Sequence, residues 1–226
     1  MKKIQKMNEI AWVIGIVLCT LGICLCTKAN LGLSMIAAPP YIFHVWLRDL
    51  IPWFTQGTAE YFWQGVILII TCIATRKFKM SYLLSFGTAV IAGVSLDMWF
   101  WIFGGNGAYE EIGLRIFSFV VGLILSSIAV AFVFRTTLPA QIYELAVMAI
   151  ADKFALDRGK VKMANDVIMF VLSAVLSFVL TGGFGGFGIG TIVITIINAP
   201  LITLFGKIID RYFEFDSMFS GFFKER

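Results

Sequence analysis

The sequence predicts an all-α membrane protein in which six transmembrane helices and two short half-membrane helices form two inverted-topology repeats. Hydrophobic residues make up 59% of the 226 residues and charged residues only 14%, whereas soluble domains carry about 25% charged residues. The mean hydropathy is +0.90. Apolar runs of about 20 residues, long enough to cross a hydrocarbon core of about 30 Å, recur along the chain. The order of one long run, one short run and two long runs occurs twice.

The long apolar runs are expected to be the transmembrane helices, at 10–27, 59–75, 80–103, 113–134, 161–181 and 187–207. A shorter hydrophobic segment follows the first and the fourth run, at 31–47 and 138–151. The basic N-terminus precedes a run that is too long for a signal peptide, so we interpret it as the first anchor. The expected divisions are a first repeat (1–104), an outer loop (105–112), a second repeat (113–207) and a cytoplasmic amphipathic tail (208–226).

The distribution of positive charge predicts the orientation in the membrane. With cytoplasmic N- and C-termini, fifteen of the eighteen Lys and Arg residues lie inside, and only Lys28, Arg48 and Arg115 lie outside. If either short segment crossed the membrane fully, a basic cluster would move outside. Both segments are therefore predicted to re-enter and return, with entry points buried in protein or facing a cavity. The net charge of +4 follows from this topology, so no nucleic-acid partner is expected.

Local matches between the two halves support the repeat. They pair 26–32 with 133–139, 54–57 with 156–159, and 86–90 with 189–193. This register pairs Gln64 with Asp166, Ser95 with Asn198, and Asp97 with Pro200. Because each half has three spans, the second half enters the membrane from the opposite side. Transporters with such repeats bind their substrate between the halves, near the bilayer midplane.

These landmarks resemble the YczE/YyaS/YitT-type integral membrane proteins of bacteria, a largely uncharacterised group, over nearly the whole chain. The motifs that carry the resemblance are Ala29-Asn30-Leu31-Gly32-Leu33-Ser34, Pro39-Pro40-Tyr41, Asp97, Leu138-Pro139, Gly159-Lys160-Val161-Lys162, Asp166 and Gly188-Ile189-Gly190-Thr191. The resemblance implies a multi-pass protein of the bacterial cytoplasmic membrane. It supplies neither a substrate nor a catalytic residue.

Polar side chains inside the spans are the first candidates for a ligand site, because burying them in a membrane is costly. Asp97 is interpreted either as a ligand for a cation, a proton or a substrate amine, or as an outer-interface carboxylate bonded to a neighbouring helix. Lys162 and Asp166 lie four residues apart and either form a structural ion pair or line an inner vestibule. Gln64 is the repeat counterpart of Asp166.

The short segments supply further candidates. Gln141 and Glu144 lie three residues apart on one face, and Ser34 occupies the matching place in the first half. The N-terminal ends of half-helices suit an anionic group or a dipolar solute. Asn198, next to a helix-interrupting Pro200, can hydrogen-bond across helices. The ligand- or ion-binding candidates are therefore Asp97, Gln141, Glu144, Asn198, Ser34, Asp166, Lys162 and Gln64.

Two function classes remain open. One is a transporter or channel for a small solute or ion, and the other is an accessory or regulatory protein that acts through a membrane partner. An enzyme is not expected, because the chain has neither a His-Glu-x-x-His nor a Gly-x-Ser-x-Gly motif.

No metal or cofactor is expected: the cysteines (Cys19, Cys24, Cys26 and Cys72) lack zinc-ligand spacing, and His44 is the single histidine. The expected partners are the lipid bilayer and the solute, and the small number of spans leaves a homodimer open.

Overall fold

The computed structural model describes residues 8–136, 138–183 and 185–213, which contain eight helices. They are α1 (Asn8–Ala29), α2 (Ala38–Leu47), α3 (Gln56–Thr75), α4 (Met80–Ile102), α5 (Ile112–Val133), α6 (Ile142–Phe154), α7 (Arg158–Thr181) and α8 (Ile189–Tyr212). All except α2 and α6 are long and apolar enough to cross a membrane. The chain is therefore an all-helical, multi-pass membrane protein that contacts the lipid bilayer. The basic start of the chain and most of the expected amphipathic tail lie outside the described residues.

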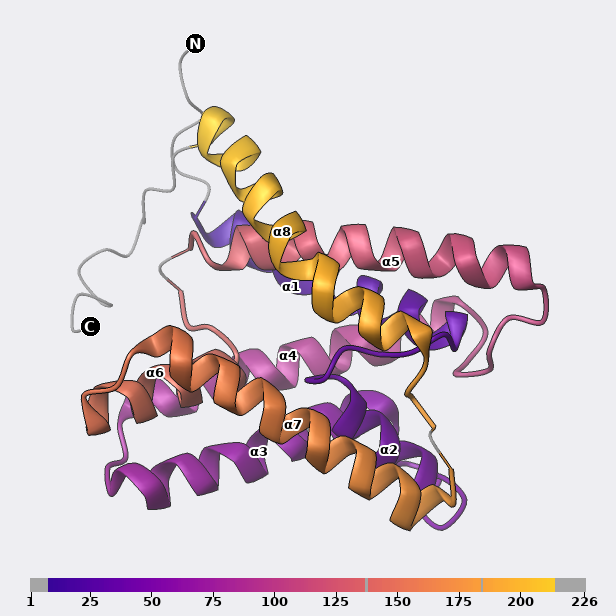
Figure 1. Cartoon of the computed structure of the whole chain (residues 1–226), viewed down its shortest axis with the longest axis horizontal. Helices are drawn as coiled ribbons and strands as arrows, with labels where there is room; N and C mark the ends of the chain where they lie inside the picture. The colour runs from indigo at the N-terminus through magenta and orange to yellow at the C-terminus, as the bar shows by residue number, and fades with distance from the viewer. Residues whose placement is uncertain (1–7, 137, 184, 214–226) are drawn as a thin grey trace.

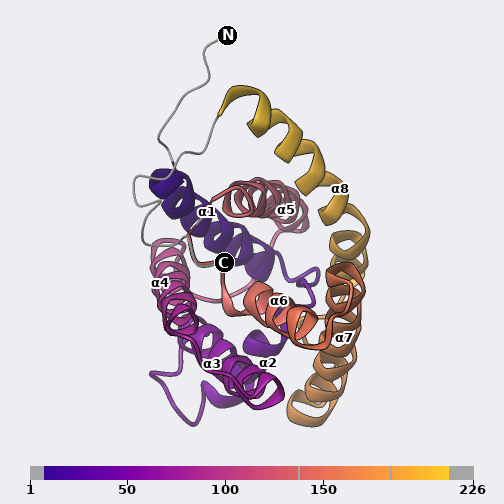
Figure 2. The same ribbon diagram turned by 90° about the vertical axis from the view of Figure 1, so that its left-hand side faces the viewer.

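The long helices form a bundle around the two short ones. Helices α1, α3, α4 and α5 run along the long axis of the molecule, while α7 and α8 are tilted across one flank (Figure 1). In the view along the axis, α2 and α6 lie between the α3–α4 side and α7 (Figure 2). Helix α2 packs on α3 and α7, and α6 packs on the same two helices. The start of α1 and the end of α8 lie at the same end of the bundle, as an even number of spans requires.

Small residues bring α1 and α5 into close contact. A Cβ atom added to Gly22 would lie 2.7 Å from the carbonyl oxygen of Gly122, and one added to Gly122 would lie 2.8 Å from that of Gly22. A Cβ atom on Gly15 would lie 3.2 Å from the carbonyl oxygen of Ala129. Small residues allow this approach because helices in lipid associate through close backbone packing.

Several helix boundaries differ from the expected ones, and end residues explain the differences. Helix α3 begins at Gln56 rather than 59 because the Thr55 hydroxyl accepts a hydrogen bond from Thr58 N. Helix α7 begins at Arg158 rather than 161 because the Asp157 side chain accepts one from Lys160 N. Helices α2 and α6 begin only at residues 38 and 142, so non-helical segments precede both.

Partners within the protein satisfy the backbone of these two non-helical segments. In the first, the Leu31 carbonyl accepts from Gly190 N over 2.8 Å, and Leu33 N donates to the Gly186 carbonyl over 2.9 Å. In the second, the Pro139 carbonyl accepts from Trp12 Nε1 and from the Thr88 hydroxyl, at 3.0 and 3.2 Å. Backbone groups that are buried away from water require such partners.

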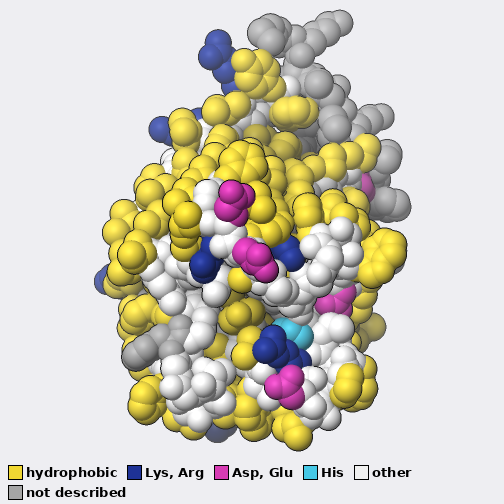
Figure 3. Space-filling model, turned by 90° about the vertical axis from the view of Figure 1, so that its right-hand side faces the viewer, with side chains coloured by type: hydrophobic (Ala, Val, Ile, Leu, Met, Phe, Trp, Pro, Cys, Tyr) yellow, Lys and Arg dark blue, Asp and Glu magenta, His cyan; other side chains and the backbone are white. Residues whose placement is uncertain are grey.

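Charged side chains gather at the ends of the molecule. Figure 3 shows the end that carries the α2–α3 and α4–α5 loops, with charged and histidine side chains in the middle of an apolar rim. This end includes the exposed pair Arg48 and Asp49 and the exposed acids Glu110 and Glu111. An apolar circumference with charged ends is the distribution that a bilayer selects.

Candidate functional site

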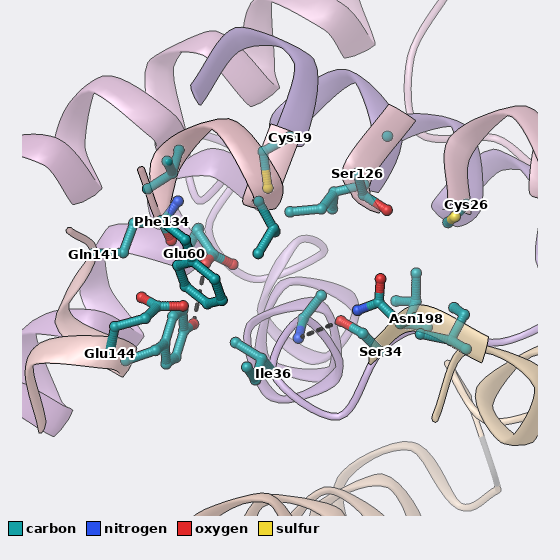
Figure 4. Close-up of a pocket in the computed structure, with 18 residues that line it drawn as sticks. Cys19, Cys26, Ser34, Ile36, Glu60, Ser126, Phe134, Gln141, Glu144 and Asn198 are labelled. Carbon is teal, nitrogen blue, oxygen red and sulfur yellow. Dashed lines mark hydrogen bonds between the residues drawn. The ribbon is translucent and has the colours of Figure 1, made fainter. Parts of the chain in front are cut away.

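A cavity of about 150 Å³ lies between the two halves of the chain. The non-helical entry to α2 contributes Ser34, and the start of α6 contributes Gln141 and Glu144. Helices α1, α3, α5 and α8 complete the wall, and Figure 4 shows Glu60 and Asn198 among the lining side chains. The beginnings of both short helices therefore border the same cavity.

The acidic end of the cavity is built by α3 and α6. The Tyr143 hydroxyl donates to Glu60 Oε1 over 3.0 Å, and Gln64 Nε2 donates to the same oxygen over 3.2 Å. Gln64 Nε2 also donates to Gln141 Oε1 over 3.2 Å, while Gln64 Oε1 accepts from Ile142 N over 3.1 Å. Gln64 thus caps the first turn of α6 and holds Glu60 in place. Such a linked set of buried polar groups fixes its members more firmly than isolated bonds do.

Glu144 is the second carboxylate of this end. It lies in the first turn of α6, lines the cavity and is half-buried. In Figure 4 it lies on the same side of the cavity as Glu60 and Gln141. Its position in the first turn places it near the partial positive charge of the helix N-terminus.

The opposite end of the cavity is polar and neutral. The Ser127 hydroxyl donates to Asn198 Oδ1 over 2.9 Å, which leaves the Asn198 amide NH₂ group on the cavity side. Ser34 Oγ accepts from Ala37 N over 3.3 Å in the turn before α2. Figure 4 shows Ser34 and Asn198 close together, away from the two carboxylates. The two ends of the site therefore differ in charge.

Two cysteines line the cavity rather than only filling the core. Cys19 and Cys26 come from α1, and Ser126 faces them from α5. All four cysteines are free thiols. Among the described residues, no group of three or more His, Cys, Asp or Glu side chains is arranged to hold a metal ion.

Asp97 lies apart from this cavity. Its Oδ1 atom accepts from Gly57 N over 2.8 Å, and its Oδ2 atom accepts from the Thr55 hydroxyl over 2.6 Å. The carboxylate therefore caps the N-terminus of α3 from α4, where helix polarity favours negative charge. This geometry matches the second of the two interpretations of Asp97, a carboxylate bonded to a neighbouring helix.

Lys162 and Asp166 line a separate groove of about 560 Å³ between α7 and α8. Their side chains form an ion pair over 3.6 Å. Within the described residues, Asp166 Oδ1 and Thr191 Oγ1 are buried without a hydrogen-bond partner, and both residues line this groove. Of the eight predicted residues, four therefore line the central cavity, Gln64 supports it, two line the groove and Asp97 caps a helix.

Glu60 is the central residue that the sequence analysis missed. It is 5% exposed and lies one turn before Gln64 on α3. The available signal was the spacing of Glu60 and Gln64, which places both side chains on one helix face. An acid at the expected edge of a span resembles an interfacial residue, and only the packing of α6 brings it inside.

Basic residues at both ends of the bundle bind backbone carbonyl groups or a carboxylate and thereby connect neighbouring segments. Lys28 is 4% exposed and donates to the carbonyls of Gly105 and Gly107 over 2.8 and 3.0 Å. At the other end, Arg135 pairs with Asp210 and donates to the Ala131 carbonyl over 3.0 Å. Neither cation lines the central cavity.

Comparisons with known proteins match the chain to a family and to a curated relative whose printed descriptions assign no activity. The model of a family described as "Family of unknown function (DUF6198)" matches residues 6–207. The chain is 26% identical over 200 residues to "Uncharacterized protein YyaS" of Bacillus subtilis (strain 168), which covers 88% of this chain and 92% of the relative. This relative supports the resemblance to the YyaS-type proteins. No solved structure matches.

Proposed function

Since the chain belongs to the Family of unknown function (DUF6198), whose description assigns no activity, we propose a function from the site itself. The protein is a transporter for a small solute or ion, and it binds its substrate between two inverted repeats. The observation that carries this proposal is the cavity of about 150 Å³ to which both halves, and the beginnings of both short helices, contribute side chains. In transporters with inverted repeats, discontinuous helices form the substrate site in this way.

Equivalent hydrogen bonds in the two halves support the inverted repeat. In the first half, the hydroxyls of Thr20 on α1 and Ser95 on α4 are 2.9 Å apart. In the second half, Ser127 on α5 and Asn198 on α8 form a bond of the same length. The register that aligns 26–32 with 133–139 also pairs Thr20 with Ser127, and Ser95 is already paired with Asn198. The two bonds therefore join residues that the repeat register pairs.

The close contacts between the halves follow the same register. It pairs Gly15 with Gly122 and Gly22 with Ala129, so the Gly22–Gly122 approach corresponds to the Gly15–Ala129 approach. The contacts of the two entry segments also correspond, because the register pairs Thr88 with Thr191 and Gly32 with Pro139. Thr88 donates to the Pro139 carbonyl, and a Cβ atom on Gly32, the counterpart of Pro139, would lie 2.6 Å from the hydroxyl oxygen of Thr191.

The lengths and positions of α2 and α6 support the re-entrant interpretation. Helix α2 has 10 residues and α6 has 13, too few to cross a bilayer. The protein contacts around Leu31 and Pro139 remove the cost of their unwound entries. With the N-terminus in the cytoplasm, α2 enters from outside and α6 from inside.

The halves differ in one respect, and this difference suggests alternating access. Gly57 on α3 and Gly93 on α4 are in close contact. Their counterparts are Gly159 on α7 and Ile196 on α8, which both line the open groove. No α7–α8 packing occurs among the described residues. If each half adopted the helix packing of the other, α7 would close on α8 and α3 would separate from α4. Transporters with inverted repeats give access to alternate sides of the membrane through such a movement.

A topology test addresses the proposed orientation in the bacterial cytoplasmic membrane. In a chain whose native cysteines are replaced by serine, Gly107→Cys lies in the proposed outer loop and Phe78→Cys in the proposed inner loop. We expect a membrane-impermeant maleimide to label the first variant in intact cells and the second only after permeabilisation. The opposite pattern would contradict the orientation.

Transport is tested by counterflow in proteoliposomes. The purified protein is reconstituted into proteoliposomes, which are loaded with a pooled solute set and then exposed to each isotopically labelled solute. The Glu60→Gln variant is assayed in the same way. Accumulation of at least one solute, lost in Glu60→Gln, is expected. Absence of any flux, combined with stable co-purification of another membrane protein, would favour the accessory or regulatory alternative.

A further inference from the structure

The lining of the central cavity is unbalanced in charge. Glu60 and Glu144 supply two carboxylates, and none of the lining residues is a Lys, an Arg or a His. The other polar lining groups are amides, hydroxyls and thiols. Buried charges persist only when they are paired or neutralised, so this site favours an occupant that brings positive charge.

The geometry of Glu60 leaves one oxygen for such an occupant. Both hydrogen bonds that Glu60 accepts, from Tyr143 and Gln64, end on Oε1. No described residue donates to Oε2. The carboxylate is thus oriented by its neighbours while half of its acceptor capacity is unused. A positioned but unsaturated acceptor is the usual form of a recognition group in a pocket.

Two basic side chains outside the cavity are paired with other acids. Lys162 pairs with Asp166 over 3.6 Å on the groove between α7 and α8. Arg135 pairs with Asp210 at the end of the bundle. Neither side chain lines the cavity, so neither neutralises the carboxylates by direct contact.

The remaining wall favours an organic cation over a metal ion. Apolar side chains from several helices line it, including Ile23, Leu33, Ile36 and Ile194, together with the ring of Phe134. Within the described residues, no cluster of three acids or other metal-ligating side chains occurs here, whereas Ca²⁺ takes six to eight oxygen ligands and Mg²⁺ an octahedral set. An ammonium group needs fewer acceptors, and aromatic rings also attract it.

We propose that the substrate of this site is a small organic cation, with its ammonium group at Glu60 and Glu144 and its carbon skeleton against the apolar side chains of the wall. The inference rests on the proposed transport function, because it names the substrate class of the same cavity. The volume of about 150 Å³ has room for a small molecule.

A matched series of probes tests the charge. n-Butylammonium, butyrate and 1-butanol have the same carbon chain and differ in charge, and each is added to the purified full chain during thermal unfolding. n-Butylammonium is expected to raise the unfolding temperature, and the other two are not. Since charge-assisted hydrogen bonds contribute about 1.5–3 kcal/mol, the Glu60→Gln and Glu144→Gln variants should bind it at least about tenfold more weakly.

Asp152→Asn is the matched control, because Asp152 is an exposed acid on the same helix as Glu144. It should respond to n-butylammonium like the unmodified chain. If Glu60→Gln fails to fold, Glu144→Gln still tests the proposal. No side chain of another described residue donates to the Glu144 carboxylate, so this substitution should leave the fold intact. An equal response to butyrate or 1-butanol, or an undiminished response in the variants, would overturn the proposal.

Flux measurements separate this inference from the proposed function. Carboxylate-dependent binding of n-butylammonium without exchange in proteoliposomes would contradict transport and leave the ligand class standing. Exchange of butyrate that Glu60→Gln abolishes would support transport and contradict the cationic class.

Discussion

The hydroxyl of Tyr143 on α6 donates to Oε1 of Glu60 on α3 over 3.0 Å, at the wall of the central cavity. This bond joins one of the short helices to a membrane span of the other half. It also orients the acid that is proposed to bind substrate, so the same hydrogen bond joins the two helices and positions a binding group.

The first prediction concerns this contact. Tyr143→Phe removes the hydroxyl and leaves Glu60 Oε1 with Gln64 as its remaining described donor. A lost hydrogen bond to a buried carboxylate should lower the free energy of unfolding by about 1.5–3 kcal/mol. Thermal unfolding in detergent measures it. The control is Tyr61→Phe, whose half-buried hydroxyl bonds Thr58 over 3.3 Å and should matter less. Equal losses in both variants would contradict the role of the Tyr143–Glu60 bond.

The second prediction concerns the α1–α5 crossing. In Gly22→Ala the new Cβ atom would lie 2.7 Å from the backbone oxygen of Gly122, so the helices must separate. Overpacking of this kind costs about 1–3 kcal/mol. Gly87→Ala on α4 is the control, because nothing lies within 4 Å of its Cβ position, and it should be neutral or stabilising. Similar unfolding temperatures for the two variants would argue against this crossing.

Local sequence patterns predicted the spans but not what the polar residues contact. Hydropathy located the six long helices to within a few residues, because length and apolar content are local properties. Asn198 was identified because a polar group in a span is costly wherever it lies, and Glu144 because it shares one face of a short segment with Gln141. The place of Asp97 depends on α3 packing beside α4, where it bonds Gly57, 40 residues away. Contacts at such separation arise from tertiary packing, which no local pattern encodes.

The third prediction separates Asp97 from the substrate site. Asp97→Asn weakens two charge-assisted bonds at the start of α3, to Gly57 N and the Thr55 hydroxyl. The unfolding temperature should fall, and the response to n-butylammonium should persist in the folded fraction. Asp49→Asn, at a side chain that is 88% exposed, should change neither. A variant that melts normally but no longer responds to the cation would restore Asp97 as a ligand.

The fourth prediction concerns pH. His44 Nδ1 donates to the Phe54 carbonyl over 2.9 Å, and His44 Nε2 accepts from Asn106 Nδ2 over 2.7 Å. Burial lowers the pKa of His44 below its usual value of about 6.5. The unfolded chain therefore binds a proton more readily than the folded one. The contribution of His44 to stability should be constant above about pH 6.5 and should fall as the pH decreases toward the lowered pKa.

Melting temperatures measured from neutral to mildly acidic pH test this prediction. In His44→Gln the acid-dependent loss should be smaller. In Asn106→Asp a carboxylate faces Nε2 and favours the imidazolium, which raises the pKa of His44 and should reduce or reverse the slope. Identical slopes in all three proteins would show that His44 does not control the pH dependence.

The fifth prediction concerns the groove between α7 and α8. If the halves exchange arrangements, Gly159 and Ile196 approach each other as Gly57 and Gly93 already do. A Gly159→Cys/Ile196→Cys pair in a chain without native cysteines should then form a disulfide under mild oxidation, which requires Cα atoms within about 7 Å. Cross-linking should stop solute exchange in proteoliposomes, and reduction should restore it. A Phe178→Cys/Leu204→Cys pair, at opposite ends of the two helices, should not cross-link. Full exchange by the cross-linked protein would mean that closure of α7 on α8 is not part of the transport cycle.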